Sequence, residues 1–264
     1  MVYTKVFVRS ALKDKRLQLF AQPICSYVQG EDAPRFEVTS GIFSAHENCI
    51  VPAEKWIDAV SRDAEAMQAL DFNTLQQVLK LKLRTQFWLN VSPLSLQDEH
   101  WVNRAVRTIR NSGVAPQNLV FEVIEQVPIE NILPACETLR ELGCGLVLDD
   151  FGSGYSVIDE LVNLPLTALK FDKELCQRVT EVRGAMLLEA YTGISRMMGL
   201  HVVAEGVENE NQLTWLRHLG VHMFQGYLFG GPSPIDDSPP SRRLPVWPSF
   251  ACKPPAGDYA APSA

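Results

Sequence analysis

The sequence predicts an α/β protein, a closed (β/α)8 TIM-like barrel with one antiparallel strand near its start. Segments typical of strands and helices alternate from residue 86 onward, and such alternation indicates a parallel sheet. Eight strand-like segments fall within roughly 220 residues, which is the usual size of such a barrel. No G-x-G-x-x-G motif follows an early strand. This weakens the alternative, an open doubly wound sheet.

The first two strands are expected to form a hairpin. Residues 17–24 are typical of a strand, and residues 35–43 alternate between apolar and polar side chains. A short turn at residues 30–34 separates them, which favours antiparallel pairing. Helical periodicity then continues in pieces over residues 53–83, and Pro52 precedes its first turn.

Strands and helices then follow one another in strict order. The expected strands are 86–91, 119–124, 144–148, 166–171, 200–204 and 221–224. The expected helices are 99–112, 128–142, 184–198 and 209–219, and each is followed by a glycine, a common helix terminator.

The chain is expected to consist of three parts. Residues 1–16 form a lead-in segment, residues 17–234 form the barrel, and residues 235–264 form a tail. Nine prolines lie between Pro232 and Pro262, a density that regular helices and sheets do not tolerate. We therefore expect the tail to be disordered. The lead-in is too short for a further domain, which predicts a stand-alone module.

Composition narrows the choice of partners. The formal net charge is -7, with 31 acidic and 24 basic residues, which argues against a nucleic-acid polymer. No apolar run approaches the ~18 residues of a membrane span, and the N-terminus lacks a secretion signal. Six cysteines occur without any C-x-x-C pair. We interpret them as reduced packing residues of a cytoplasmic protein.

Polar side chains lie at almost every expected strand end. In a barrel, the carboxyl ends of the strands converge on the face that carries the active site. A single acid at such a place is usually solvated or caps a helix, so the argument depends on the whole set. The set comprises Glu37, Asn90, Glu122, Asp149, Asp150, Lys170, Glu205 and Gln225.

This set favours metal-assisted phosphoester hydrolysis. Hard oxygen ligands select Mg²⁺ or Mn²⁺ over zinc, and none of the histidines stands at an expected strand end. Two such ions could activate a water and stabilise the leaving oxygen. Aldolases and enolase-type enzymes also place acids and a lysine at a barrel mouth, so these residues alone leave the reaction open.

Eight short motifs then carry a resemblance. They are Gln22-Pro23-Ile24, Phe36-Glu37-Val38, Leu89-Asn90-Val91-Ser92, Phe121-Glu122-Val123-Ile124-Glu125, Asp149-Asp150-Phe151-Gly152-Ser153-Gly154-Tyr155-Ser156, Leu169-Lys170-Phe171-Asp172, Ala204-Glu205-Gly206-Val207-Glu208 and Gln225-Gly226-Tyr227. In this order they resemble the EAL domain family, phosphodiesterases of the bacterial second messenger cyclic di-GMP. The resemblance covers roughly residues 14–234 and implies a cyclic-guanylate phosphodiesterase that produces linear pGpG.

The resemblance also implies a role for each motif residue. The predicted ligands of two Mg²⁺ or Mn²⁺ ions are Glu37, Asn90, Glu122 and Asp149 for the first, Asp149 and Asp150 for the second, and Gln225 for the metal–water shell. Lys170 and Glu205 would bind metal or orient the attacking water, one of them as its base. Gln22 and Pro23 would contact the substrate, and Glu125 would anchor the loop that follows Asp150.

The signature departs from the family after Glu37. Thr39 stands where a leucine packs on the ligand, and Gly41 stands where an arginine reaches a phosphate. Losing such a contact costs about 1.5–3 kcal/mol of binding. Near the end, Gly230-Gly231-Pro232 replaces the common Ser-Arg-Pro. The departures suggest an alternative: a catalytically impaired module that acts by binding the nucleotide or a protein partner.

Two further expectations concern chemistry and assembly. A Schiff-base mechanism at Lys170 is disfavoured, because neighbouring acids would keep the pKa of the amine high. The resemblance implies homodimerisation through helices near the Asp150 loop, with residues 172–179 as one candidate surface. It also implies a role in motility, adhesion or biofilm formation.

Overall fold

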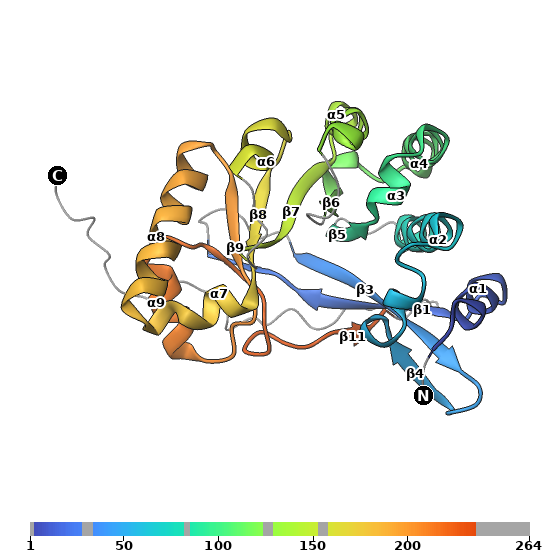
Figure 1. The fold of residues 1–264 in the computed structure, drawn as a ribbon, viewed down its shortest axis with the longest axis horizontal. Helices are drawn as coiled ribbons and strands as arrows, with labels where there is room; N and C mark the ends of the chain where they lie inside the picture. The colour runs from blue at the N-terminus through green and yellow to red at the C-terminus, as the bar shows by residue number, and fades with distance from the viewer. Residues whose placement is uncertain (1–2, 28–33, 82–84, 124–128, 153–157, 236–264) are drawn as a thin grey trace.

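Residues 3–27, 34–81, 85–123, 129–152 and 158–235 are described in the computed structural model of the chain. Their strands form one curled mixed sheet, with helices along its outer side (Figure 1). This matches the expected TIM-barrel-like α/β class. Glu125, the Ser153–Ser156 part of the glycine-rich loop, and all of the expected tail except Ile235 lie outside the described residues.

The sheet contains eleven strands among the described residues. Their order is β11-β1-β3-β5-β6-β7-β8-β9-β10-β2, with β4 paired to β3. The strands are β1 (Leu17–Pro23), β2 (Cys25–Ser26), β3 (Arg35–Ser44), β4 (Cys49–Pro52), β5 (Gln86–Val91), β6 (Leu119–Val123), β7 (Gly145–Phe151), β8 (Ala168–Phe171), β9 (His201–Ala204), β10 (Met223–Phe224) and β11 (Ser233–Pro234).

The two ends of this sheet meet. Strands β3 to β10 pair in parallel, whereas β1 is antiparallel to β3, as the predicted hairpin requires. Only Ile24 separates β1 from β2, and β2 pairs with β10. The first strand segment therefore bridges β3 and β10.

The helices cover the outer side of the sheet (Figure 1). They are α1 (Lys5–Lys13), α2 (Ala64–Leu81), α3 (Pro93–Leu96), α4 (Glu99–Ser112), α5 (Leu133–Leu142), α6 (Ile158–Asn163), α7 (Lys173–Gln177), α8 (Val182–Met197) and α9 (Glu210–His218), with 3-10 turns at Ala53–Lys55, Ile57–Ala59, Pro116–Asn118, Ile129–Asn131 and Arg178–Thr180. Helix α4 shows the local logic. The Asp98 carboxylate accepts hydrogen bonds from the His100 and Trp101 amides, and Gly113 ends the helix at φ +76°.

Several expected boundaries were wrong. Strands β2, β4 and β11 were not foreseen, because each is short and is formed by pairing with a partner distant in sequence or beyond a turn. Strand β7 continues to Phe151 instead of ending at residue 148. The helix expected from residue 128 begins at Leu133, after a 3-10 turn.

The core lies between the sheet and its helices. One cluster of buried side chains joins α1, α2, α4 and α5 to strands β1, β3, β5 and β6, and Val8, Ala11 and Leu12 of the lead-in belong to it. A second cluster joins α7, α8 and α9 to strands β7, β8 and β9. Leu175, Cys176 and Val179 belong to this second cluster, so the apolar residues of the candidate dimer surface at 172–179 face the core.

Two further expectations from the sequence concern membrane-spanning segments and the cysteines. Among the described residues, no helix is both long and apolar enough to cross a membrane. Cys136, Cys144 and Cys176 are buried free thiols, and burial raises the pKa of Cys136 and Cys144 to about 12. These thiols behave as packing residues, as the sequence suggested.

Candidate active site

The interior of the curled sheet is filled by a layer of apolar side chains. It consists of Ile24, Trp88, Val120, Val147, Ala168, Val203 and Met223. Side chains two residues apart on a strand share a face. The interior positions one step toward the mouth are therefore Gln22, Asn90, Glu122, Asp149, Lys170, Glu205 and Gln225. The alternation of side chains thus places seven predicted site residues in one polar layer, directly above the apolar layer.

Lys170 is the centre of this polar layer. Its side chain is 1% exposed, and its Nζ lies 2.6 Å from Glu205 Oε1 and 3.1 Å from Asp149 Oδ1. Glu37 Oε2 and Glu122 Oε1 each lie 3.3 Å from the same nitrogen. One ammonium group therefore faces four carboxylates contributed by four different strands and their ends.

Burial and mutual repulsion perturb these groups strongly. For Lys170, burial alone would lower the pKa, but the carboxylates outweigh it and the pKa stands well above its ordinary value. Burial raises the pKa of Glu122, and it raises that of Glu205 to about 8 against the attraction of Lys170. Glu37 differs: Lys170 and hydrogen bonds from Gln225, Lys170 and Asn90 overcome burial and lower its pKa.

Amide side chains complete the layer beside Glu37. Asn90 Nδ2 donates to Glu37 Oε1 at 3.3 Å, and Gln225 Nε2 donates to Glu37 Oε2. Gln225 also donates to Gln22 Oε1 at 3.1 Å, and Gln22 donates to the Gly230 carbonyl. Glu37 lies within β3 rather than at its end, but β3 pairs with β5 only as far as Val38. Glu37 is therefore at the edge of the barrel portion of its strand.

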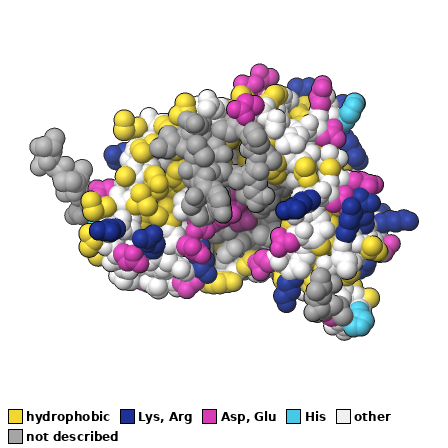
Figure 2. All heavy atoms as spheres, in the orientation of Figure 1, with side chains coloured by type: hydrophobic (Ala, Val, Ile, Leu, Met, Phe, Trp, Pro, Cys, Tyr) yellow, Lys and Arg dark blue, Asp and Glu magenta, His cyan; other side chains and the backbone are white. Residues whose placement is uncertain are grey.

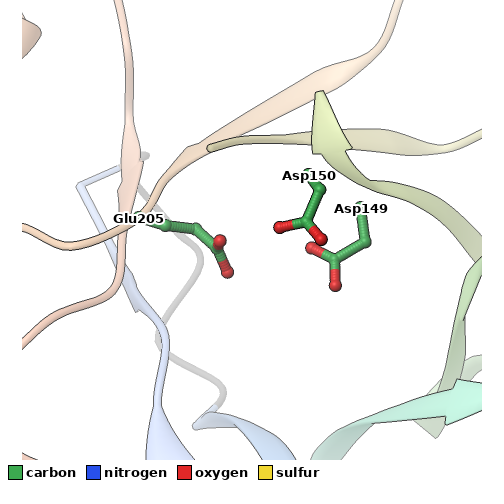
Figure 3. Close-up of side chains that lie close together, drawn as sticks. All are labelled: Asp149, Asp150 and Glu205. Atoms are coloured by element: carbon green, nitrogen blue, oxygen red, sulfur yellow. The ribbon is translucent and has the colours of Figure 1, made fainter. Parts of the chain in front are cut away.

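Asp149 and Asp150 depend on a distortion of β7. Consecutive side chains of a regular strand point to opposite faces. Here the β7–β8 register shifts between Leu148 and Phe151, and Asp150 adopts φ +55°, in the left-handed region. The irregularity brings both carboxylates toward Glu205, as Figure 3 shows. Burial and the adjacent Asp149 raise the pKa of Asp150 to about 6.

The donor set fits divalent cations. One oxygen each of Asp149, Asp150 and Glu205 lies within 4.8 Å of the others. Three buried oxygens, on Glu122, Asp149 and Gln225, accept no hydrogen bond within the described structure, although Lys170 lies near two of them. Buried oxygens of this kind are costly unless they are partnered. The excess of carboxylates over Lys170 therefore suits hard cations with oxygen ligands.

A cavity of about 730 Å³ adjoins this layer and is lined by Gln22, Glu37, Glu205 and Gln225. Figure 2 views the molecule from this side and shows acidic side chains beside its central hollow. The cavity also contains side chains that the sequence analysis missed, namely Phe20, Ile50, Glu54, Lys173, Glu208 and Tyr227. Pro23, predicted to contact substrate, is buried and is not among the lining residues.

The EAL domain family model matches residues 7–232. The chain belongs to the EAL domain family. Its relatives include the cyclic di-GMP phosphodiesterase NbdA of Pseudomonas aeruginosa, 31% identical over 90% of this chain and 33% of NbdA. The probable cyclic di-GMP phosphodiesterase PdeA of Escherichia coli is 29% identical over 87% of this chain and 32% of PdeA. This chain thus spans about a third of the length of these relatives.

A solved EAL structure has the same fold. The EAL domain of FimX from Pseudomonas aeruginosa, bound to c-di-GMP, superposes with a TM-score of 0.78 at 22% identity. The match covers 86% of this chain and 94% of that domain. At this identity the likeness concerns the fold, which agrees with the TIM-like barrel predicted from the sequence.

Proposed function

We propose that this EAL domain hydrolyses cyclic di-GMP to linear pGpG, with two Mg²⁺ or Mn²⁺ ions as cofactors. The observation that carries the proposal is the buried cluster in which Lys170 faces four carboxylates from separate strands. The names of the relatives NbdA and PdeA support the same substrate. Hydrolysis would break one P–O3′ bond while a water oxygen bonds to that phosphorus.

The side chains of the cluster would be shared between two metal ions. Glu37, Asn90, Glu122 and Asp149 would hold the first, Asp149 and Asp150 the second, and Gln225 would complete the shell of bound water. When bound, such ions lower the pKa of a coordinated water and neutralise charge on the phosphate oxygens. Asn90 and Gln225 already donate through nitrogen to Glu37, which leaves their oxygens for a cation.

Glu205 is the better base of the two predicted catalytic residues. Burial, Asp149 and Glu37 raise its pKa to about 8, so its ionised form, which predominates only above that pH, binds a proton more strongly than an ordinary carboxylate. Lys170 stays protonated because the surrounding carboxylates raise its pKa well above the ordinary value. Lys170 would therefore orient the water and offset negative charge, while Glu205 accepts the proton. The proton that Glu205 takes from the water would balance the one that the departing 3′ oxygen gains, so that the enzyme ends with no net change in protonation.

The direct test is a turnover assay with Mg²⁺, Mn²⁺ and Ca²⁺ in parallel. The purified protein should convert cyclic di-GMP to pGpG with Mg²⁺ or Mn²⁺, as chromatography of the products would show. Glu37→Ala and Asp149→Ala should abolish conversion, because each removes a carboxylate of the cluster. Intact substrate after long incubation at high protein concentration would refute the proposal.

The second candidate is a module that binds cyclic di-GMP or a protein partner without turnover. The wall at Gly41 favours it, because a Cβ there would lie 2.5 Å from Ile50 Cγ2 and 3.1 Å from Phe20 Cε2. The arginine that the resemblance expects cannot be accommodated without moving these side chains. Calorimetry with cyclic di-GMP and Ca²⁺ distinguishes nucleotide binding from protein binding. Binding of the nucleotide, together with no turnover in Mn²⁺, would support a cyclic di-GMP receptor. The absence of any binding heat would support a role in binding a protein partner.

We also propose that this EAL domain is cytoplasmic and forms a homodimer through helix α8. Val182, Met186 and Met197 are 78%, 64% and 87% exposed on it, and Val162 of α6 is 69% exposed. The spacing of Val182, Met186 and Met197 places them on one side of α8, and exposed apolar side chains on one face are typical of an interface. Met186→Glu should convert the dimer to a monomer in light scattering, and an unchanged mass would count against this surface.

A further inference from the structure

The cavity beside the acidic cluster has an unusual charge balance. Its described lining includes the carboxylates of Glu37, Glu54, Glu205 and Glu208, and Lys173 is the one cationic side chain among these lining residues. A cyclic dinucleotide carries two phosphodiester anions. The phosphate that reacts would lie at the metal-binding cluster. The other needs a different positive group, because an anion beside several carboxylates is otherwise repelled.

The wall built by β3 and β4 does not provide that group. At Gly41, the place of a Cβ is already taken by Ile50 and approached closely by Phe20. Phe20 and Ile50 instead line the cavity with apolar surface, next to Thr39 and Ser40. This wall suits a base or a sugar better than a phosphate.

Lys173 is placed to meet the second phosphate. It is the first residue of α7 and follows Asp172, which caps that helix. Its aliphatic stem packs on Gly206, where an added Cβ would collide with Lys173 Cγ and lie 2.9 Å from its Cβ. Gly206 has φ +62° and directly follows Glu205. The missing side chain at residue 206 thus lets the lysine stem pack against the backbone there, and both residues line the cavity.

The ammonium group of Lys173 remains available to a ligand. Its Nζ lies 3.5 Å from Glu208 Oε1, and both side chains are about half exposed, at 52% and 45%. Exposed ion pairs contribute little stability, so exchanging the carboxylate for a phosphate costs little. An ammonium on a flexible stem also acts as a point charge that tolerates several phosphate positions.

We propose that Lys173 binds the non-reacting phosphate of the cyclic dinucleotide and so selects substrates with two phosphodiesters. The inference rests on the proposed function and specifies how that substrate is held. It assigns Lys173 to substrate binding rather than to the reacting atoms. Removing its charge should therefore raise KM and leave kcat nearly unchanged.

The test compares two substrates and two matched variants. Lys173→Gln should raise KM for cyclic di-GMP roughly tenfold, the size expected for one charge-assisted contact, with kcat within about twofold. With bis(p-nitrophenyl) phosphate, which has one phosphodiester, KM should not change. Lys173→Arg should restore most of the affinity. Lys80→Gln makes the same charge change on α2, outside the cavity, and serves as the control.

Each result separates this inference from the proposed function. An unchanged KM for cyclic di-GMP in Lys173→Gln would overturn the role of Lys173 while leaving the phosphodiesterase intact. An equal loss with both substrates would also overturn it, because it would indicate a general structural effect. If the wild type has no turnover, the proposed function fails, and calorimetry with cyclic di-GMP and Ca²⁺ decides instead. A dissociation constant unchanged by Lys173→Gln, or no binding by the wild type, then overturns the inference.

Discussion

Asp71 offers a test of how burial controls a carboxylate near the site. It lies on α2, is 7% exposed, and accepts hydrogen bonds from the Ser92 amide at 2.8 Å and from Ser95 Oγ at 2.6 Å. Burial raises its pKa from 3.8 to about 7, and the two hydrogen bonds oppose this rise only in part. We predict that Asp71→Asn becomes progressively more stable than the wild type as the pH rises.

The sign follows from proton linkage. Between pH 3.8 and about 7, the folded wild type retains a proton on Asp71 that the unfolded chain has lost. Its unfolding free energy therefore falls by about 1.4 kcal/mol per pH unit in that window, relative to a variant that cannot titrate. Between pH 5 and pH 8 the difference should widen by about 2.5 kcal/mol in favour of Asp71→Asn. A change in hydrogen bonding that does not depend on pH shifts the unfolding free energy by the same amount at every pH.

Urea unfolding at several pH values measures this difference. The buried Trp56, Trp88 and Trp101 provide a fluorescence signal. Asp58→Asn, which makes the same substitution at an exposed position, is the matched control. Parallel curves for Asp71→Asn and the wild type would refute the reasoning, since they would mean that folding does not perturb Asp71.

Three other changes test the site and its supports. Lys170→Met should cost about 3–5 kcal/mol of unfolding free energy, because it leaves buried carboxylates without their ammonium; Mn²⁺ should restore much of the melting temperature, and a melt insensitive to Mn²⁺ would contradict the metal site. Asp150→Gly should change stability by no more than about 1 kcal/mol, since glycine accepts φ +55°, yet abolish turnover; retained hydrolysis would remove Asp150 from the ligand set. Gly184→Ala should lower the unfolding free energy measured in urea by about 1–3 kcal/mol, because the added Cβ would overlap the Arg178 carbonyl. A variant as stable as the wild type would mean that α8 can move to relieve this overlap.

Much of the site could be predicted because strand geometry is periodic. Trp88 and Asn90, or Val203 and Glu205, alternate with outward residues, so an apolar floor and a polar mouth follow from the sequence. The alternating pattern of residues 35–43 also predicted an antiparallel pair with residues 17–24, and the pairing of β1 with β3 confirmed it. Parallel strands end on one face, which is why residues far apart in sequence could be assigned to one cluster.

The features that were missed depend on tertiary contacts. Asp149 and Asp150 were both predicted as ligands, and alternation accounts for Asp149, but the register shift in β7 and the left-handed backbone at Asp150 that bring Asp150 beside it were not foreseen. Lys173 was passed over because it begins a helix, whereas its stem is directed by a close approach to Gly206. Local sequence does not encode such contacts.

The hydrogen bond between Gln22 and Gln225 joins residues 203 positions apart, and this separation has a consequence for biosynthesis. A nascent chain that has emerged from the ribosome as far as Glu205, the residue after β9, already carries Glu37 and Glu122 as well. Without β10, however, the strand β2 has no partner. The unpaired edges of such an intermediate are sites for aggregation. The complete set of site residues is therefore assembled only after β10 has been synthesised and has paired with β2.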